Sequence, residues 1–179
     1  MDEVKPQPLD SKVLEQLIAE SDRIEEDAKH SAKSHFECAD GWGYRNMWIG
    51  IPTTIAAAIA GVAALKNYPL VAGIMSLAVA ASSAVFTFLN PKERSGSHLA
   101  AGNNYKCLQN DTRMFRCIDC VQRATDLKLI DDLKALNDRR NKLNAESPQF
   151  SRKAFNRARE GINQGEATYA VDKGANPPA

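Results

Sequence analysis

The middle of the chain contains two long apolar runs without a charged residue, 46–65 and 69–90, separated by a short segment that includes Lys66. Each run has about the 20 residues that a helix needs to cross a hydrocarbon core roughly 30 Å thick. A soluble helix of this length carries a charged stripe along one side, and neither run has one. The pattern therefore predicts two transmembrane helices, 46–65 and 69–90.

The alternative is a helical hairpin buried inside a soluble protein. Such a hairpin needs a large surrounding protein to cover it, and the flanking segments are too polar and too short for that. Aromatic side chains of the kind that lie at membrane–water interfaces occur at both ends of the hairpin. They are Trp42, Tyr44 and Trp48 around the entry to the first run and Tyr68 at the turn.

The connection between the two runs is very short. Pro69 suits the first position of the second helix, where its missing N–H costs nothing, so Lys66, Asn67 and Tyr68 form the whole loop. A loop of three residues forces the two helices to run antiparallel. Both chain termini are then expected on the same side of the membrane.

The distribution of basic residues predicts which side that is. Lysine and arginine are enriched in the cytoplasmic segments that flank transmembrane helices. The flanks hold six such residues and the loop one, so we expect both termini in the cytosol. The six are Lys29, Lys33, Arg45, Lys92, Arg94 and Lys106, and the one is Lys66.

An N-terminal cytosolic helix is expected over residues 10–43. Asp10 or Ser11 can cap it, and the glycines Gly41 and Gly43 are expected to break the helix or act as a hinge just before the membrane. Pro52, near the start of the first span, predicts a local kink. The apolar positions at helical spacing are Leu14, Leu17, Ile18, Ile24 and Ala28.

C-terminal cytosolic helices are expected over residues 97–172, followed by a flexible tail at 173–179. Residues 95–97 are predicted to form a loop or cap, before a long polar helix that ends near Ala145. A partial heptad seam in that helix indicates packing on the other arm or on a neighbouring subunit. Its members are Leu108, Phe115, Gln122, Leu129, Leu136 and Leu143, with Leu133 between them.

A further helix is predicted to start at Ser147 and Pro148, because proline suits the first helical position. The fold class is therefore all-α: a two-transmembrane helical hairpin with long cytosolic N- and C-terminal helices, forming one domain over residues 1–179.

The two spans are rich in small residues, which let helix backbones approach closely in lipid. These faces serve packing within one hairpin, assembly of hairpins, or both. Polar and small residues also follow one face of the second span, either bonded to their own backbone or facing water in an oligomeric pore. The packing candidates are Ala57, Gly61, Ala72 and Ala84, and the pore-lining candidates are Ser76, Ala80, Ser83, Thr87 and Asn90.

Composition adds mainly exclusions. The net charge of +1 gives no basic surface for nucleic acid. Cys117 and Cys120 form a CxxC without the further ligands that a zinc site needs. We find no pattern of catalytic residues or of a phosphate-binding glycine loop, so we expect no enzyme, cofactor or metal.

Three segments resemble the SLATT family, the SMODS- and SLOG-associating two-transmembrane effector domains of bacteria. They are residues 48–52 (WIGIP), the run that contains Arg94, His98, Ala101, Tyr105 and Leu108, and the closing stretch from Arg139 to Lys173. The resemblance covers most of the chain, about Lys29 to Lys173, and rests on order and spacing together with the hairpin.

This resemblance implies an effector of the bacterial inner membrane that acts in anti-phage or nucleotide-second-messenger conflict systems. It would oligomerise in the lipid bilayer into a pore, with a cytosolic nucleotide signal or nucleotide-sensing protein as partner. His98 and Tyr105 match polar landmarks of the family, and we expect them to fix the membrane-proximal helix to the first arm; the alternative is that they contact a ligand. Residues 161–172 would be ordered in the last helix. A non-conducting scaffold that recruits a cytosolic partner through its helical arms is the alternative.

A directly bound nucleotide would meet the basic residues of the C-terminal part, because guanidinium groups pair with phosphate. The alternative is that these residues are solvated or paired with Glu146 and Glu160. The basic residues are Arg139, Arg140, Arg152, Lys153, Arg157 and Arg159.

Overall fold

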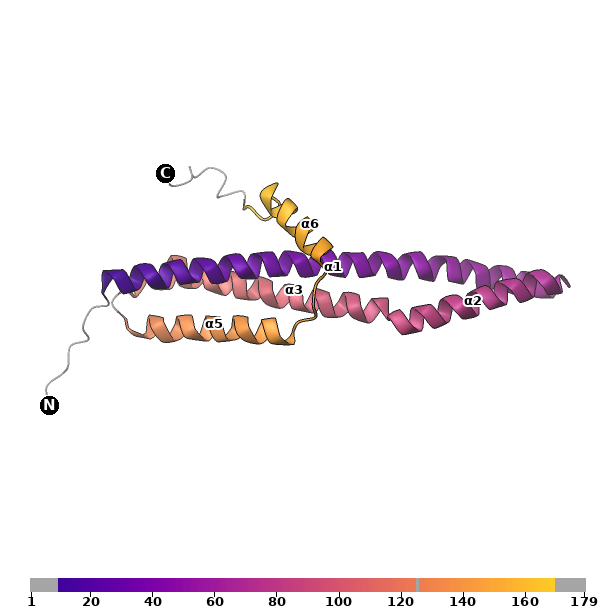
Figure 1. Cartoon of the computed structure of the whole chain (residues 1–179), viewed down its shortest axis with the longest axis horizontal. Helices are drawn as coiled ribbons and strands as arrows, with labels where there is room; N and C mark the ends of the chain where they lie inside the picture. The colour runs from indigo at the N-terminus through magenta and orange to yellow at the C-terminus, as the bar shows by residue number, and fades with distance from the viewer. Residues whose placement is uncertain (1–9, 125, 170–179) are drawn as a thin grey trace. The chain divides into compact units, whose positions relative to one another are not determined.

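The computed structural model describes residues 10–124 and 126–169, and every regular element in these ranges is a helix (Figure 1). The predicted all-α class is confirmed. The chain divides into two compact units. We call residues 38–97 the apolar unit, and residues 10–37 and 98–169 the bundle unit. The expected tail at 173–179 lies outside the described residues.

Helix α1 spans Ser11–Leu65 without interruption, so the predicted break at Gly41 and Gly43 is wrong. A glycine inside a helix costs only about 1 kcal/mol relative to alanine, and the packing of the apolar unit offsets this cost. Beside Gly43 the hydroxyl of Ser95 donates a hydrogen bond to the Ala39 carbonyl at 2.8 Å. The start of α1 agrees with the sequence, since the Asp10 carboxylate accepts the Lys12 N–H at 3.1 Å.

The connection between the two apolar helices occupies residues 66–68. Helix α1 ends at Leu65, and α2 spans Pro69–Leu89 with its proline in the first helical turn. Asn67 takes the left-handed conformation at φ 57°, which asparagine tolerates better than most residues. At the other end of α2, Asn90 caps the helix at φ 41° and donates its N–H to the Phe86 carbonyl at 2.9 Å.

Within the apolar unit, α1 and α2 each bury one narrow stripe. The partly covered positions recur at alternating intervals of three and four residues, which is the spacing of a coiled-coil seam. Nearly all other positions of both apolar runs are exposed. The stripe comprises Asn46, Ile49, Thr53, Ala56, Ala60 and Ala63 on α1, and Ala72, Met75, Val79, Ser82, Phe86 and Leu89 on α2.

The helix after the second span differs from the prediction at both ends. Helix α3 spans Pro91–Met114, so residues 95–97 are helical and the predicted loop is wrong. It continues as a π-helical turn, η1 (Phe115–Asp119), and a short α4 (Cys120–Gln122). The predicted single helix to Ala145 is therefore also wrong.

The chain reverses after α4, and α5 (Lys128–Glu146) runs beside α1 and α3 in the bundle unit (Figure 1). Arg123 holds this reversal by donating to Asp126 at 3.0 Å and to Asp132 at 2.8 Å. The predicted heptad seam is thus split between two helices, and Gln122 is exposed.

The core of the bundle unit lies between α1, α3 and α5. It contains residues from all three helices, so the apolar positions predicted on the first arm and on the C-terminal arm meet one another. The buried apolar members are Leu17, Ile24, Ala28, Ala32, Tyr105, Leu108, Phe115, Cys120, Leu129 and Leu133.

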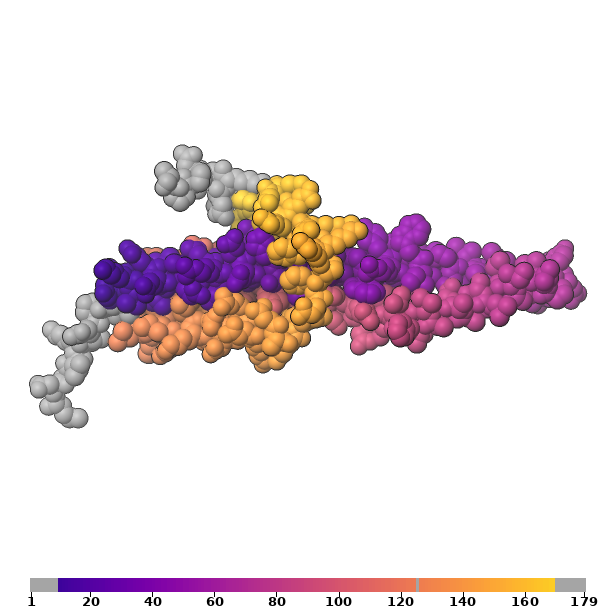
Figure 2. Space-filling view, viewed as in Figure 1, coloured from indigo at the N-terminus to yellow at the C-terminus, as the bar shows by residue number. Residues whose placement is uncertain are grey.

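Helix α6 (Arg152–Asn163) lies across the bundle unit, as Figure 2 shows. Ser151 caps it by accepting the Ala154 N–H at 3.2 Å. The predicted start at Pro148 is wrong, because Ser147 is extended and the chain up to Ser151 is not helical. The helix expected over 161–172 ends at Asn163, and residues 170–172 lie outside the described range.

Candidate functional site

The pore-lining candidates lie together on one exposed face of α2. All five are exposed and share a face beside the seam to α1, since residues three and four apart lie on one side of a helix. Nothing within the described chain covers this face. The five are Ser76, Ala80, Ser83, Thr87 and Asn90.

Several polar groups of the apolar helices are bonded within their own helix. Thr53 donates to the Ile49 carbonyl at 2.7 Å, and Thr87 donates to the Ser83 carbonyl at 2.9 Å. The amide of Asn90, which caps α2, instead donates to the Glu93 carboxylate in α3. Such back-bonding lets a hydroxyl stay in an apolar environment, and it leaves the hydroxyls of Ser76 and Ser83 as the exposed polar groups of the face.

The small residues proposed for helix packing fall on different surfaces. Ala72 lies in the seam between α1 and α2, whereas Ala57, Gly61 and Ala84 are exposed. A Cβ built on Gly61 meets no atom within 4 Å. These three positions therefore present small, exposed surface that another helix could cover.

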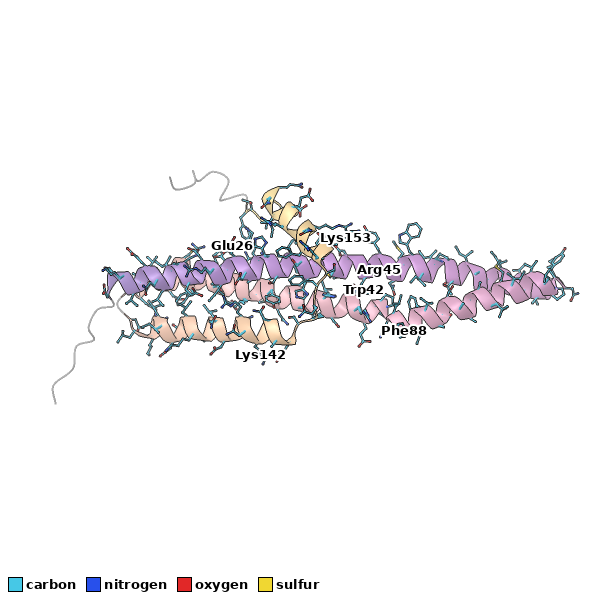
Figure 3. All side chains as sticks on the ribbon, in the orientation of Figure 1. Glu26, Trp42, Arg45, Phe88, Lys142 and Lys153 are labelled. Atoms are coloured by element: carbon cyan, nitrogen blue, oxygen red, sulfur yellow. The ribbon has the colours of Figure 1, made fainter. Side chains whose placement is uncertain are left out.

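Large apolar side chains on α2 project away from the chain. Leu70 is 75%, Leu77 73% and Phe88 84% exposed. Figure 3 labels Phe88 among these side chains. Soluble monomers rarely expose continuous apolar surfaces of this kind, which mark contacts with lipid or protein. The most apolar stretch of α1 is 11% buried, and that of the helical segment that begins at Pro69 is 0% buried. Both are long and apolar enough to cross a membrane.

In the bundle unit, His98 on α3 meets His35 on α1, and their Nδ1 atoms lie 3.0 Å apart. Tyr105 stacks on the His35 ring with a centroid distance of 5.5 Å. Phe150 meets the same ring edge-on at 5.2 Å. The structure therefore brings both polar residues singled out in the sequence onto a single histidine of the first helix.

Burial decides the protonation of this cluster. Removal from water lowers the pKa of His35 to about 4, with a smaller contribution from the charge of His98, and burial also lowers the pKa of His98. The Tyr105 hydroxyl donates to Asn144 Oδ1 at 2.7 Å, and burial raises its pKa. All three rings are thus neutral near pH 7, which suits a structural contact between α1, α3 and α5.

The basic residues of the C-terminal part fall into two groups. Arg139 pairs with Asp111, and Arg140 pairs with Asp27 at 3.2 Å, so these two link helices of the bundle. Their partners are aspartates rather than the expected Glu146 and Glu160. The four basic residues of α6 are exposed and have no ion pair among the described residues.

The sequence analysis missed His35 as the partner of His98. It lies seven residues after Ala28 and three after Ala32, on the same buried face of α1, so helical periodicity could have placed it in the core. It also missed Arg116, whose guanidinium lies 2.8 Å from both Asp22 and Glu25. No local pattern indicates that long-range pair.

The thiols show no special arrangement. The four cysteines are free, with Cys117 exposed and Cys120 buried at the junction of η1 and α4. Within residues 10–124 and 126–169, no three histidine, cysteine or acidic side chains are grouped as a metal site would require. Comparison with known proteins finds no matching family model, no curated relative and no similar solved structure.

Proposed function

We propose that this chain is an integral membrane protein of the SLATT type, whose hairpin assembles into a pore in the bacterial inner membrane. In this proposal α1 and α2 cross the bilayer, their connecting turn lies outside, and both termini and the bundle unit lie in the cytosol. Opening of the pore would depolarise a cell in response to a conflict signal and arrest or kill it.

The observation that carries the proposal is the exposure of the apolar surface of α2. Its apolar surface is exposed, and only a narrow stripe of it is partly covered. In this proposal, lipid covers the large apolar side chains on one side of α2. The exposed face with Ser76, Ala80 and Ser83 is narrow, small and polar, which suits close contact between helices or the wall of an aqueous path.

Two helices cannot enclose a path, so conduction requires several copies. The exposed small residues Ala57, Gly61 and Ala84 offer surfaces for such assembly, because small side chains let helices approach in lipid. No charged residue lies inside either apolar run, which favours a gated pore over an ion-coupled carrier.

The test compares two alanine-to-leucine changes on adjacent residues. Ala80→Leu places a bulky apolar side chain on the polar face. Ala81→Leu makes the same change at an exposed position about 100° around the helix. We expect wild type and Ala81→Leu to depolarise bacteria that express a triggering partner, as measured with a potential-sensitive dye. Ala80→Leu should insert into the membrane normally but leave the potential unchanged.

Equal behaviour of the two variants, or no dye release from liposomes with any partner, would contradict a pore. Insertion is measured separately, by resistance to alkaline carbonate extraction. A variant that no longer inserts is not informative about conduction, and Ser83→Leu then takes its place on the same face.

One observation favours the alternative, a scaffold that recruits a cytosolic protein. The end of the bundle unit exposes apolar side chains around η1 and α4: Met114 at 55%, Ile118 at 40%, Val121 at 73% and Leu127 at 57%. Leu108, Phe115 and Leu129 of the heptad seam are buried inside the bundle, and Leu136 of the same seam is partly buried against this core. Under the scaffold function, Val121→Glu would abolish activity and Ala80→Leu would not.

A further inference from the structure

Trp42, in the apolar unit just before the first span, has two arginines on its ring. The guanidinium carbon of Arg45 lies 4.5 Å from the ring centroid, and that of Arg94 lies 5.0 Å from it. Trp42 and Arg45 belong to α1 and Arg94 to α3 (Figure 3 labels the first two). The two guanidinium groups can be no farther apart than the sum of these distances.

The two arginines thus bring two like charges to one ring. Among the described residues, neither arginine forms an ion pair. Of the acidic residues in the same region, Glu93 bonds to the Asn90 amide, and Asp40 makes no pair with either arginine. The tryptophan ring attracts both cations but carries no net charge, so their mutual repulsion remains uncompensated.

The position of the cluster suggests what compensates it. Arg45 directly precedes the first apolar run, 46–65, and Arg94 lies four residues after the end of the second run, 69–90. If α1 and α2 cross the bilayer, both guanidinium groups lie at the depth of the lipid headgroups. Tryptophan and arginine are both favoured at this depth, because each has an apolar body and a polar end.

We propose that Arg45, Arg94 and Trp42 form a binding site for the phosphate of an anionic phospholipid headgroup. Guanidinium groups bind phosphate oxygens through paired hydrogen bonds, and two of them around one phosphate would link α1 to α3 through the lipid. The inference rests on the proposed membrane insertion. It adds a ligand that bridges the helices that enter and leave the membrane.

Native mass spectrometry of the full-length protein in detergent tests the site. Phosphatidylglycerol should bind with saturation and be retained over phosphatidylcholine, whose headgroup has no net charge. The Arg45→Gln/Arg94→Gln variant should bind phosphatidylglycerol about tenfold more weakly or worse, given the strength of charge-assisted hydrogen bonds. The matched control, Lys66→Gln/Lys92→Gln, removes two boundary charges away from Trp42 and should bind as wild type does.

A second measurement avoids changes to the arginines. The chain has two tryptophans, so Trp48→Phe leaves Trp42 as the only one. Its fluorescence should change saturably with phosphatidylglycerol and not with phosphatidylcholine.

Four results would overturn the proposal. Equal losses in the two double variants would indicate general charge attraction, and displacement of the lipid by inorganic phosphate or ATP would indicate a water-soluble ligand. Failure to resist carbonate extraction would overturn both the membrane function and this site, whereas firm integration without lipid preference would overturn the site alone.

Discussion

Nδ1 of His35 lies 3.0 Å from Nδ1 of His98, in the core where α1 meets α3. Two nitrogens at this distance share one proton, so one ring donates and the other accepts. Addition of a second proton would place two N–H groups opposite each other. The contact therefore depends on the accepting ring remaining neutral.

This dependence predicts acid sensitivity of the bundle unit. An unfolded histidine titrates near 6.5, whereas burial lowers the pKa of His35 to about 4. The unfolded chain then binds more protons between these values, so stability is complete above pH 6.5 and falls as the pH decreases toward 4. The loss should reach about 3 kcal/mol, measured by denaturant unfolding in detergent across this range.

His35→Phe should flatten that pH profile, because it removes the group whose pKa is lowered most. His30→Gln on the same helix should keep the profile of the wild type, since His30 lies outside the buried cluster. A profile that is unchanged in His35→Phe would show that other groups cause the acid sensitivity.

At Gly102 the Phe36 ring of α1 packs closely on α3. A Cβ there would lie 2.6 Å from Cε1 of Phe36, so Gly102→Ala should destabilise the protein by about 1–3 kcal/mol through overpacking. Gly96→Ala in the same helix meets no atom within 4 Å and should stabilise by about 0.5–1 kcal/mol. Thermal unfolding followed by circular dichroism distinguishes the two, and Phe36→Leu should partly rescue Gly102→Ala.

Arg116 links η1 to α1 through two carboxylates. Arg116→Ala leaves Glu25, which is 17% exposed, without its partner, and should cost about 1–3 kcal/mol. Arg23→Ala breaks an exposed pair with Glu20 and should change stability by under about 0.5 kcal/mol. If denaturant unfolding gives the same small effect for both, the Arg116 contacts do not stabilise the bundle.

Substitutions of Leu129 and Leu127 distinguish an effect on folding from an effect on partner binding. Leu129 is fully buried, so Leu129→Ala should cost about 2–5 kcal/mol through a cavity in the core. Leu127 is 57% exposed, and Leu127→Ala should leave the unfolding free energy unchanged. Loss of recruited cytosolic protein in Leu127→Ala, measured by pull-down from membranes, would favour the scaffold function.

The local sequence pattern determined the two apolar helices and the buried face of the first arm. The absence of charge over 46–65 and 69–90 predicts two long apolar helices, and Pro69 predicts where the second begins. Helical periodicity on the first arm indicates the face of Leu17, Ile24 and Ala28 that becomes the core. These features depend on neighbouring residues only, so the sequence is enough to find them.

Only the tertiary structure decided where helices continue or stop. Gly41 and Gly43 stay helical because α1 packs on both sides of them, and the long helix expected after the second span reverses where Arg123 meets Asp126 and Asp132. The meeting of His35 with His98 and of Trp42 with Arg94 joins residues more than fifty positions apart. Such contacts depend on how helices pack, and packing is a property of the whole chain rather than of any local pattern.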